Sequence, residues 1–457
     1  MARRIPTWLF LLCLLLGGVG TVFYGWAVKE VFGGNPHFGA VRDAIAAVAN
    51  FPDLVKETLR ETFEGAESPF FVVPPTISLS EFRPLRTRSG IRVEGLLARS
   101  DPAALARAPG WRVLVGPFVI DGELQFAVLI LSPELEVEKS ITIREDEPQG
   151  EGRHAIKHEF IQGFSILKDG SMVMAFEGGH SLQRIDRCGR KIWSIEGNFN
   201  HAVSAEFDGD FLWTLDGWSM DTQLVRIVTA TGKVSRRIPV VDIISANQDI
   251  DILDLGVDTD WNYEDAANIG EKWWTFDPFH LNDIEPLPPA LANNFQLFQP
   301  GDLLLSARNL NLVFVMDPRS LKIKWWHYGS WRRQHDPDWQ PTGDITVLDN
   351  KPGSRFSRIV RIDPNSHQTS VLFDGRMNDF FTYQQGKHQI IPSGDILITS
   401  ATQGRVFEVD SSGNMVFDLV NVDLKDRRHN YRMSEAVWLP PNFIGFSKML
   451  LCPGQAQ

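Results

Sequence analysis

Cysteine and tyrosine are scarce in this chain of 457 residues, and basic residues are fewer than acidic ones. Its three cysteines are too few for a disulfide-stapled scaffold or for a zinc site built from cysteines. Lysine and arginine total 45 against 57 acidic residues, which gives a formal net charge of −12. Binding to nucleic acid needs clustered basic residues, so this balance argues against a nucleic-acid partner. The 14 tryptophans against 5 tyrosines instead favour a rigid, packed architecture, because indole is a large apolar filler.

Several catalytic motifs are missing as well. The chain contains no GxSxG, HExxH, GxxxxGK[ST] or GxGxxG. Nucleophilic serine hydrolysis, zinc proteolysis and nucleotide binding therefore have no local signature, and we expect neither a metal nor a cofactor. Hydrophobic residues make up 43% and charged residues 22% of the chain, which is ordinary for a globular protein and excludes global disorder.

An uncharged run of 24 residues lies between Arg4 and Lys29. A helix of that length spans about 36 Å, enough for a hydrocarbon core of about 30 Å. Two arginines precede the run, so the positive-inside rule places the N-terminus in the cytoplasm and the rest outside. We predict that residues 1–29 form a cytoplasmic tip and a signal anchor in the inner membrane, with a periplasmic domain if the source is Gram-negative. A cleaved signal peptide is the alternative, with Gly18 and Gly20 as small residues of a cleavage site.

Residues 30–68 carry apolar side chains at helical spacing on both sides of Pro52. This pattern predicts two short amphipathic helices, which we expect to form a spacer packed on the main domain. A membrane-surface or homodimer contact is the alternative. The stripes are Val41, Ile45 and Val48, then Val55, Leu59 and Phe63.

A short theme recurs from about residue 155 onward. A strand, a glycine turn, a second strand, an apolar residue with Asp, another turn and a further strand follow one another. A period of about 45 residues with three or four short strands is typical of a β-propeller. The recurring segments are 165–195, 206–238, 298–326, 340–373 and 391–419, and the turn aspartates are Asp186, Asp317, Asp363 and Asp410.

Each repeat buries its faces only against its neighbours, so the ring of repeats must close. Residues 111–143 make a sixth unit, and we expect 434–446 to donate its missing inner strand. The sequence therefore predicts an all-β, six-bladed propeller over residues 69–448, with seven blades as the alternative and 449–457 as a tail.

Two features of this propeller stay open. The insertion at 241–279 is rich in Asp and carries three tryptophans, Trp261, Trp273 and Trp274. We expect a surface loop that caps one end of the ring, with a calcium loop as the alternative. Cys188 and Cys452 remain for an oxidising compartment, but their spacing does not decide whether they pair.

Five histidines each precede the glycine turn that opens a repeat. Because the first strand of each blade lines the central axis, these imidazoles are predicted to converge on one funnel. A structural role, with each histidine bonded to a neighbouring blade, is the alternative. The five are His158, His201, His280, His335 and His388.

Two arginines follow His335 in the segment GSRFSRIVR. Arg355 and Arg358 can present planar forks suited to sulfate or phosphate, although pairing with the many aspartates is equally open. A histidine that is neutral near pH 7 can act as nucleophile or proton carrier. Arginine beside histidine thus suggests transfer of an anionic group.

The segments HLNDIEPL (280–287), QHDPDWQPTGDITVLDN (334–350) and GRVFEVDSSGNMVFDLVN (404–421) resemble bacterial arylsulfotransferases. The resemblance runs in order over about residues 160–440. It implies a six-bladed propeller that moves a sulfuryl group from a phenolic sulfate ester to another phenol, without a nucleotide donor. The implied partners are thus a small aryl sulfate and a phenol, and the best-known members are periplasmic.

The resemblance also implies site residues. His280 and His335 match the two funnel histidines of the family, and Arg355 its arginine, with Arg358 as the competing alignment. The family's nucleophilic histidine falls at about 396–407, where this chain has none, so His388 is the expected substitute. A non-catalytic binding or scaffold module on the outer face of the membrane is the alternative function. Further residues expected to bind substrate are Asn282, His201 and Arg308.

Overall fold

A computed structural model describes most of the chain, which divides into two compact units, Met1–Ser68 and Pro69–Gln457. Most of the predicted spacer, His158 and the three tryptophans of the insertion lie outside the described residues. These are 7–32, 41, 45, 48, 72–73, 77–88, 90–143, 160–176, 181–250, 252–253, 277–425, 429–443 and 452.

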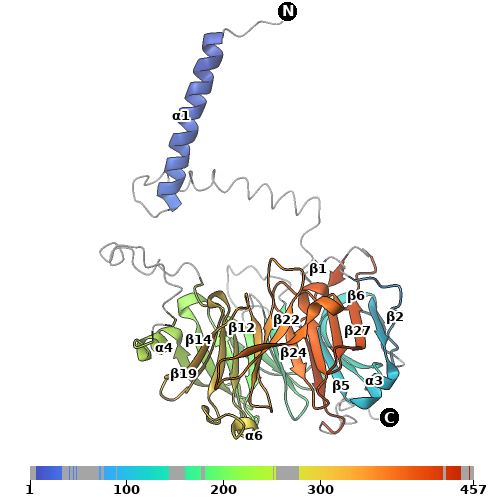
Figure 1. The fold of residues 1–457 in the computed structure, drawn as a ribbon. Helices are drawn as coiled ribbons and strands as arrows, with labels where there is room; N and C mark the ends of the chain where they lie inside the picture. The colour runs from blue at the N-terminus through green and yellow to red at the C-terminus, as the bar shows by residue number, and fades with distance from the viewer. Residues whose placement is uncertain are drawn as a thin grey trace, which may run out of the picture. The chain divides into compact units, whose positions relative to one another are not determined.

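The first unit contains one long apolar helix, α1 (Thr7–Phe32; Figure 1). Its Trp8–Lys29 portion is long and apolar enough to cross a membrane. Nearly all of its described side chains are exposed. A signal sequence near the N-terminus has the same length and composition.

The second unit is the predicted six-bladed β-propeller, and four of its blades are sheets of four consecutive antiparallel strands (Figure 1). Apolar residues alternate with polar ones, or follow one another, over five or six positions, and a turn with glycine or aspartate ends each such stretch. This pattern gives short strands and tight connections. The blades are β8 (Ile161–Ile166), β9 (Met172–Phe176), β10 (Ser181–Ile185) and β11 (Lys191–Glu196); β12 (Phe199–Ala205), β13 (Phe211–Asp216), β14 (Gln223–Val228) and β15 (Val234–Pro239); β16 (Leu281–Pro286), β17 (Leu303–Ala307), β18 (Leu312–Met316) and β19 (Ile323–Tyr328); and β20 (His335–Trp339), β21 (Ile345–Asp349), β22 (Arg358–Ile362) and β23 (Thr369–Asp374).

The other two blades join distant parts of the chain. The fifth blade contains β24 (Lys387–Ile390), β25 (Ile396–Ser400), β26 (Arg405–Val409) and β27 (Met415–Asn421). Two strands from before residue 101 extend its outer edge, namely β4 (Leu96–Ser100) and β2 (Arg83–Pro84). This extension was not predicted from the sequence, because both added strands lie outside the repeat.

The sixth blade closes the ring as predicted. Its inner strand is β29 (Glu435–Leu439), which pairs with β5 (Trp111–Ile120) and places Ala436 opposite Leu114. Short pairings also link Val93–Glu94 to β5 and Val72–Val73 to Asn430–Tyr431. The remaining elements of this region are β6 (Glu123–Leu131), β7 (Val137–Thr142), β3 (Val93–Glu94), β1 (Val72–Val73), β28 (Asn430–Tyr431) and the helix α3 (Pro102–Arg107).

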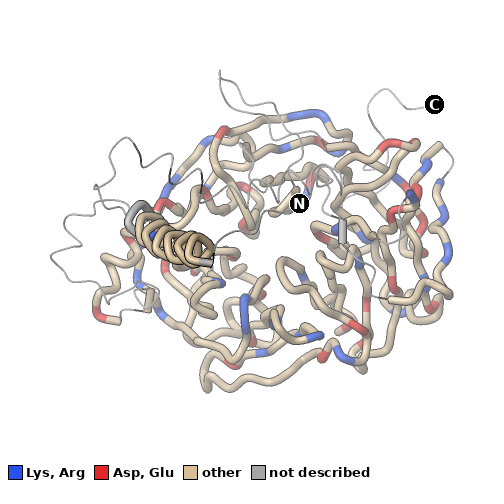
Figure 2. Tube along the Cα trace, turned by 90° about the horizontal axis from the view of Figure 1, so that it is seen from above, with Lys and Arg blue, Asp and Glu red and all other residues tan. Residues whose placement is uncertain are grey.

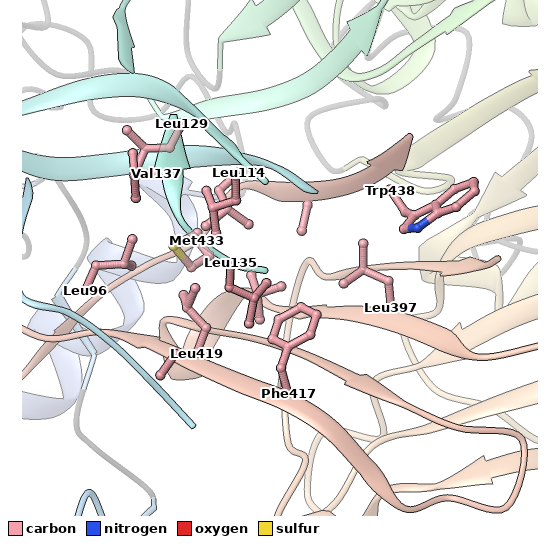
Figure 3. Close-up of a cluster of buried hydrophobic side chains, with 14 of the residues drawn as sticks. Leu96, Leu114, Leu129, Leu135, Val137, Leu397, Phe417, Leu419, Met433 and Trp438 are labelled. Atoms are coloured by element: carbon pink, nitrogen blue, oxygen red, sulfur yellow. The ribbon is translucent and has the colours of Figure 1, made fainter. Parts of the chain in front are cut away.

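A buried apolar cluster joins the fifth and sixth blades (Figure 3). It combines Leu114 of β5, Leu419 of β27 and Met433, all with no exposed surface. Burial of apolar area stabilises such a seam by about 25 cal/mol per Å². The C-terminal segment is held a second time by a disulfide between Cys188 and Cys452, whose Cα atoms lie 5.7 Å apart. This settles the pairing that the sequence left open.

The innermost strands of successive blades contact one another around a central axis, which Figure 2 shows from above. Four of these strands change register near their first residues. Such β-bulges bend a strand and re-aim its side chains. The bulges lie at Gln162, at His201 and Ala202, at Asn282, and at Asp336 and Pro337.

Candidate active site

Two histidines meet where the inner strands of the second and third blades begin. His201 lies in the bulge of β12, and His280 directly precedes β16. Both have left-handed backbones, with φ of 59° and 47°. Non-glycine residues in this region are strained and cluster at functional sites. The strained backbones bring the two imidazole rings within 4.7 Å of each other, measured between centroids.

Asp277 fixes the orientation of His280. The Nδ1 atom of His280 lies 2.6 Å from Asp277 Oδ2, and its backbone N–H donates to Asp277 Oδ1 at 2.9 Å. Burial by itself raises the pKa of Asp277, but the hydrogen bonds and charge of His280 outweigh it and lower that pKa. An ionised Asp277 assigns the Nδ1–H tautomer to His280, which leaves a lone pair on Nε2.

The two Nε2 atoms of His280 and His201 are buried and have no hydrogen-bond partner. Burial lowers the pKa of His280 despite the opposing effect of Asp277. Burial lowers the pKa of His201 well below its usual value, and the nearby His280 and His335 lower it further. Both rings are therefore neutral at pH 7, and unsatisfied buried nitrogens of this kind call for a functional explanation.

His335, at the start of β20, is fixed by neighbouring groups. Its Nδ1 lies 2.7 Å from Asn350 Oδ1, and its Nε2 accepts the backbone N–H of Gln385 at 3.3 Å. Asn350 is held in turn by donating to the carbonyls of Thr382 and Gln385. Burial lowers the pKa of His335 to about 3, although the hydrogen bond to Asn350 opposes this. His335 is thus a neutral, rigidly held member of the funnel.

Arg308 is the arginine that acts on all three of these histidines. It opens the 3-10 turn η5 (Arg308–Leu310) between β17 and β18. Its positive charge lowers the pKa of His201, His280 and His335, after the larger effect of burial. The positive charge of Arg308 therefore acts on each of the three imidazoles.

The structure places the other predicted arginines differently. Arg358 lies on β22 and donates from Nε to Asp349 Oδ2 at 2.8 Å, which is the pairing that the sequence left open as an alternative. Arg355 is an exposed residue of the connection between β21 and β22.

His388 lies deeper than the other three and is surrounded by polar partners. Its Nδ1 is 2.8 Å from Asp336 Oδ2, and its Nε2 is 2.9 Å from Thr346 Oγ1. Its side chain has no exposed surface. Both ring nitrogens are thus engaged, which leaves none free for attack on a substrate in this conformation.

A narrow cavity connects the histidines to a second layer of charged groups along the axis. It is lined by His201, His335, Asn282, Asp283 and Lys387, among others. Asn282 anchors the third blade to the fourth by donating to the carbonyl of Gln334 at 2.8 Å, and its buried Oδ1 has no partner.

Five carboxyl groups and one lysine from four inner strands form this second layer, which we call the acid layer. Lys387 of β24 lies 2.9 Å from Asp336 Oδ1 and 3.2 Å from Asp283 Oδ2. Burial by itself lowers the pKa of Lys387, but these carboxylates raise it well above its usual value. Burial by itself would raise the pKa of Asp336, but the interactions with Lys387 and His388 are stronger and lower this pKa. The other carboxyl groups are Asp283 and Glu285 of β16, Asp338 of β20 and Glu435 of β29.

Crowding of these carboxyl groups favours their protonated forms. Burial raises the pKa of Glu435 to about 8, against the effect of Lys387 and with the help of Asp336 and Asp283. Burial and neighbouring carboxylates also raise the pKa of Glu285 and Asp338 well above their usual values. The acid layer therefore holds protons at neutral pH instead of presenting five negative charges beneath the histidines.

Sequence reasoning missed Asp277 and the acid layer. The sequence could have indicated Asp277, because this carboxylate precedes His280 by three residues in DPFH. Asp336, Asp338 and His388 have donor atoms within 4.8 Å of one another, as a metal site requires. The ammonium of Lys387 already supplies the positive charge at Asp336, however, so we assign no metal to this group.

The raised pKa of Glu435 predicts a loss of stability with rising pH. In the unfolded chain this group ionises near pH 4.5, whereas in the folded chain it keeps its proton up to about pH 8. The folded state therefore binds more protons between these values, and stability falls as the pH rises through them. We expect the melting temperature to drop by about 3–6 °C from pH 5 to pH 9, and Glu435→Gln to remove much of that drop. Equal pH slopes for wild type and variant in calorimetry would contradict this assignment.

Residues 163–422, more than half of the chain, match a family model described as arylsulfotransferase (ASST). No curated protein matches the chain. Among solved structures, a protein of unknown function from Bacteroides caccae has 13% identity and a TM-score of 0.44, covering 73% of this chain and 99% of that one. TolB from Acinetobacter baumannii has 12% identity and a TM-score of 0.43, covering 72% of this chain and 67% of that one. Likenesses this weak carry no argument about function.

Proposed function

The chain belongs to the arylsulfotransferase family, and from this premise we propose that its funnel transfers a sulfuryl group from a phenolic sulfate ester to a phenol. The geometry of His280 carries the proposal. Its Nδ1 is bonded to Asp277, while its buried Nε2 has no partner, and its ring lies 4.7 Å from that of His201, whose Nε2 is also without a partner. A nucleophile oriented by a carboxylate, with a second base within reach, is the arrangement that covalent catalysis requires.

The first half of the reaction loads the enzyme. The lone pair of His280 Nε2 attacks sulfur, the bond from sulfur to the phenolic oxygen breaks, and the sulfuryl group remains on Nε2. The Nδ1–H bond to Asp277 stabilises the cationic ring that results. The anionic ester favours the protonated form of the nearby His201, which then gives this proton to the departing phenolate. Arg308 offsets the charge on the sulfuryl oxygens.

The second half restores the free enzyme. His201 Nε2 takes the proton of the acceptor phenol, and the phenolate oxygen attacks the sulfur held on His280. The bond between sulfur and Nε2 breaks, which returns the electron pair to His280 and leaves on His201 the proton that the next departing phenolate receives. No oxidant, metal or nucleotide enters the balance. His335, with both ring nitrogens engaged, shapes the funnel in this scheme.

We further propose that the propeller acts outside the cytoplasm, anchored by α1. The disulfide between Cys188 and Cys452 supports export, because structural disulfides persist in oxidising compartments. The two arginines before the apolar run favour a cytoplasmic N-terminus. In a Gram-negative cell this compartment is the periplasm.

Turnover of a chromogenic ester tests the proposed function. The full chain is incubated with 4-nitrophenyl sulfate and phenol, and 4-nitrophenolate and phenyl sulfate are quantified. We expect both products in equal amounts, with a sulfuryl group on the His280 peptide when the acceptor is left out. Absence of both products and of the modified peptide over a range of donors would overturn the proposal. That result would favour the non-catalytic binding module. The hydrogen bonds at both ring nitrogens of His388 are consistent with this alternative, because they leave no lone pair for attack.

A further inference from the structure

An exposed tryptophan lies beside the two unpartnered imidazoles. The ring centroid of Trp218 is 5.5 Å from that of His201, with the planes at 81°, and 5.9 Å from that of His280. Trp218 nevertheless keeps 39% of its surface exposed. The exposed part of the indole therefore offers an aromatic ligand an apolar surface next to the two unpartnered nitrogens.

The loop that carries Trp218 is held in place by several contacts. Gly217 has a φ of 92°, and a Cβ there would lie 2.6 Å from the carbonyl oxygen of Asp221. Asn200, buried in β12, donates to the carbonyl of Gly217 at 3.0 Å. The backbone N–H of Asp221 donates to the carbonyl of Trp218 at 3.1 Å. The backbone that carries the indole is therefore held in part by Asn200, from the same strand that carries His201.

We propose that Trp218 is the platform on which the aromatic ring of the substrate stacks, so that it sets the preference for aryl over alkyl sulfate esters. This inference rests on the proposed function. The sulfuryl end of an ester at His280 lies within the field of Arg308, while the ring extends toward Trp218. Aromatic rings attract one another in offset-stacked and edge-to-face arrangements beyond their burial of area. An alkyl ester would use the same Arg308 but gain little from the indole.

Binding of two probes to matched variants tests the inference. Phenyl sulfate and methyl sulfate are titrated calorimetrically into wild type, Trp218→Leu and Trp218→Phe. Phe207→Leu is the control, since Phe207 is also an exposed aromatic residue but follows the far end of β12. We expect Trp218→Leu to weaken phenyl sulfate binding by about three- to tenfold, with methyl sulfate within about twofold of wild type. Trp218→Phe should retain most of the preference, and Phe207→Leu all of it.

Two outcomes would overturn the inference. One is an unchanged ratio of the two dissociation constants in Trp218→Leu, and the other is no binding of phenyl sulfate to wild type. Melting temperatures of the variants show whether the funnel is intact. Turnover of 4-nitrophenyl sulfate by wild type is measured alongside. If phenyl sulfate binding depends on Trp218 but turnover is absent, the proposed function is wrong and the stacking role of Trp218 is retained. If turnover occurs but the ratio of the two dissociation constants is unchanged in Trp218→Leu, the proposed function is retained and the stacking role is wrong.

Discussion

Replacement of His280 by alanine is expected to lower sulfuryl transfer by about 10³- to 10⁶-fold, because removal of a covalent nucleophile leaves only binding and electrostatic stabilisation. The side chain is mostly buried, with 13% exposed, so the melting temperature is measured to separate loss of the nucleophile from loss of the fold. The rate of 4-nitrophenolate release and mass spectrometry of the His280 peptide are the measurements. His367→Gln is the control, since His367 is an exposed histidine in the turn between β22 and β23.

Asp277→Asn should give a smaller loss and a different kind of change. Asp277 acts as a positioning residue, because it touches His280 and not the reacting sulfur. Its negative charge raises the pKa of His280 against the effect of burial. Its removal should therefore shift the acidic limb of the pH–rate profile to lower pH, a change that a purely structural role would not produce.

For the first of these two variants, His280→Ala, a transfer rate equal to that of wild type would exclude the funnel as the active site.

The propeller was predictable because it rests on local chemistry repeated along the chain. Turn aspartates such as Asp363 and Asp410, 47 residues apart, mark equivalent turns. The inner strand donated by β29 also followed, since a ring of six units with one incomplete blade needs a strand from the other terminus. The addition of β4 and β2 to the outer edge of the fifth blade could not be predicted, because both strands lie outside the repeat.

The funnel was predictable only in outline. The phase of the inner strands predicted that five histidines converge, because equivalent positions of successive blades face one axis. Of the four that the structure describes, His201 and His280 have ring centroids 4.7 Å apart. The partners of each ring were not predictable, since they come from other strands at long sequence separation. His388 shows the limit clearly, because Asp336 and Thr346 occupy its nitrogens from a neighbouring blade. Arg308 and Trp218 lie on connections between strands, whose conformations the repeat does not specify.

Loss of the disulfide is the second large effect that we expect. Cys188 and Cys452 are 264 residues apart, so the bond restricts a very long loop of the unfolded chain. In the chain-entropy model a loop of this length contributes about 5–6 kcal/mol, while measured values are more often about 2–4 kcal/mol. For a domain of this size we expect the double variant Cys188→Ser/Cys452→Ser to melt about 2–6 °C lower, as measured by calorimetry.

The location of the bond explains why the effect should be on closure and not on chemistry. Cys188 lies in the turn between β10 and β11 of the first four-stranded blade, while Cys452 follows β29, which completes the last blade. The bond thus ties the segment after the strand that closes the ring to the two outer strands of a neighbouring blade, and not to an inner strand that carries a histidine of the site. We expect transfer rates below the melting point to stay at the wild-type level. Cys13→Ser, in α1, is the control and should melt like wild type. A wild type whose melting temperature is insensitive to reductant would show that the ring closes without this bond, through the pairing of β29 with β5 alone.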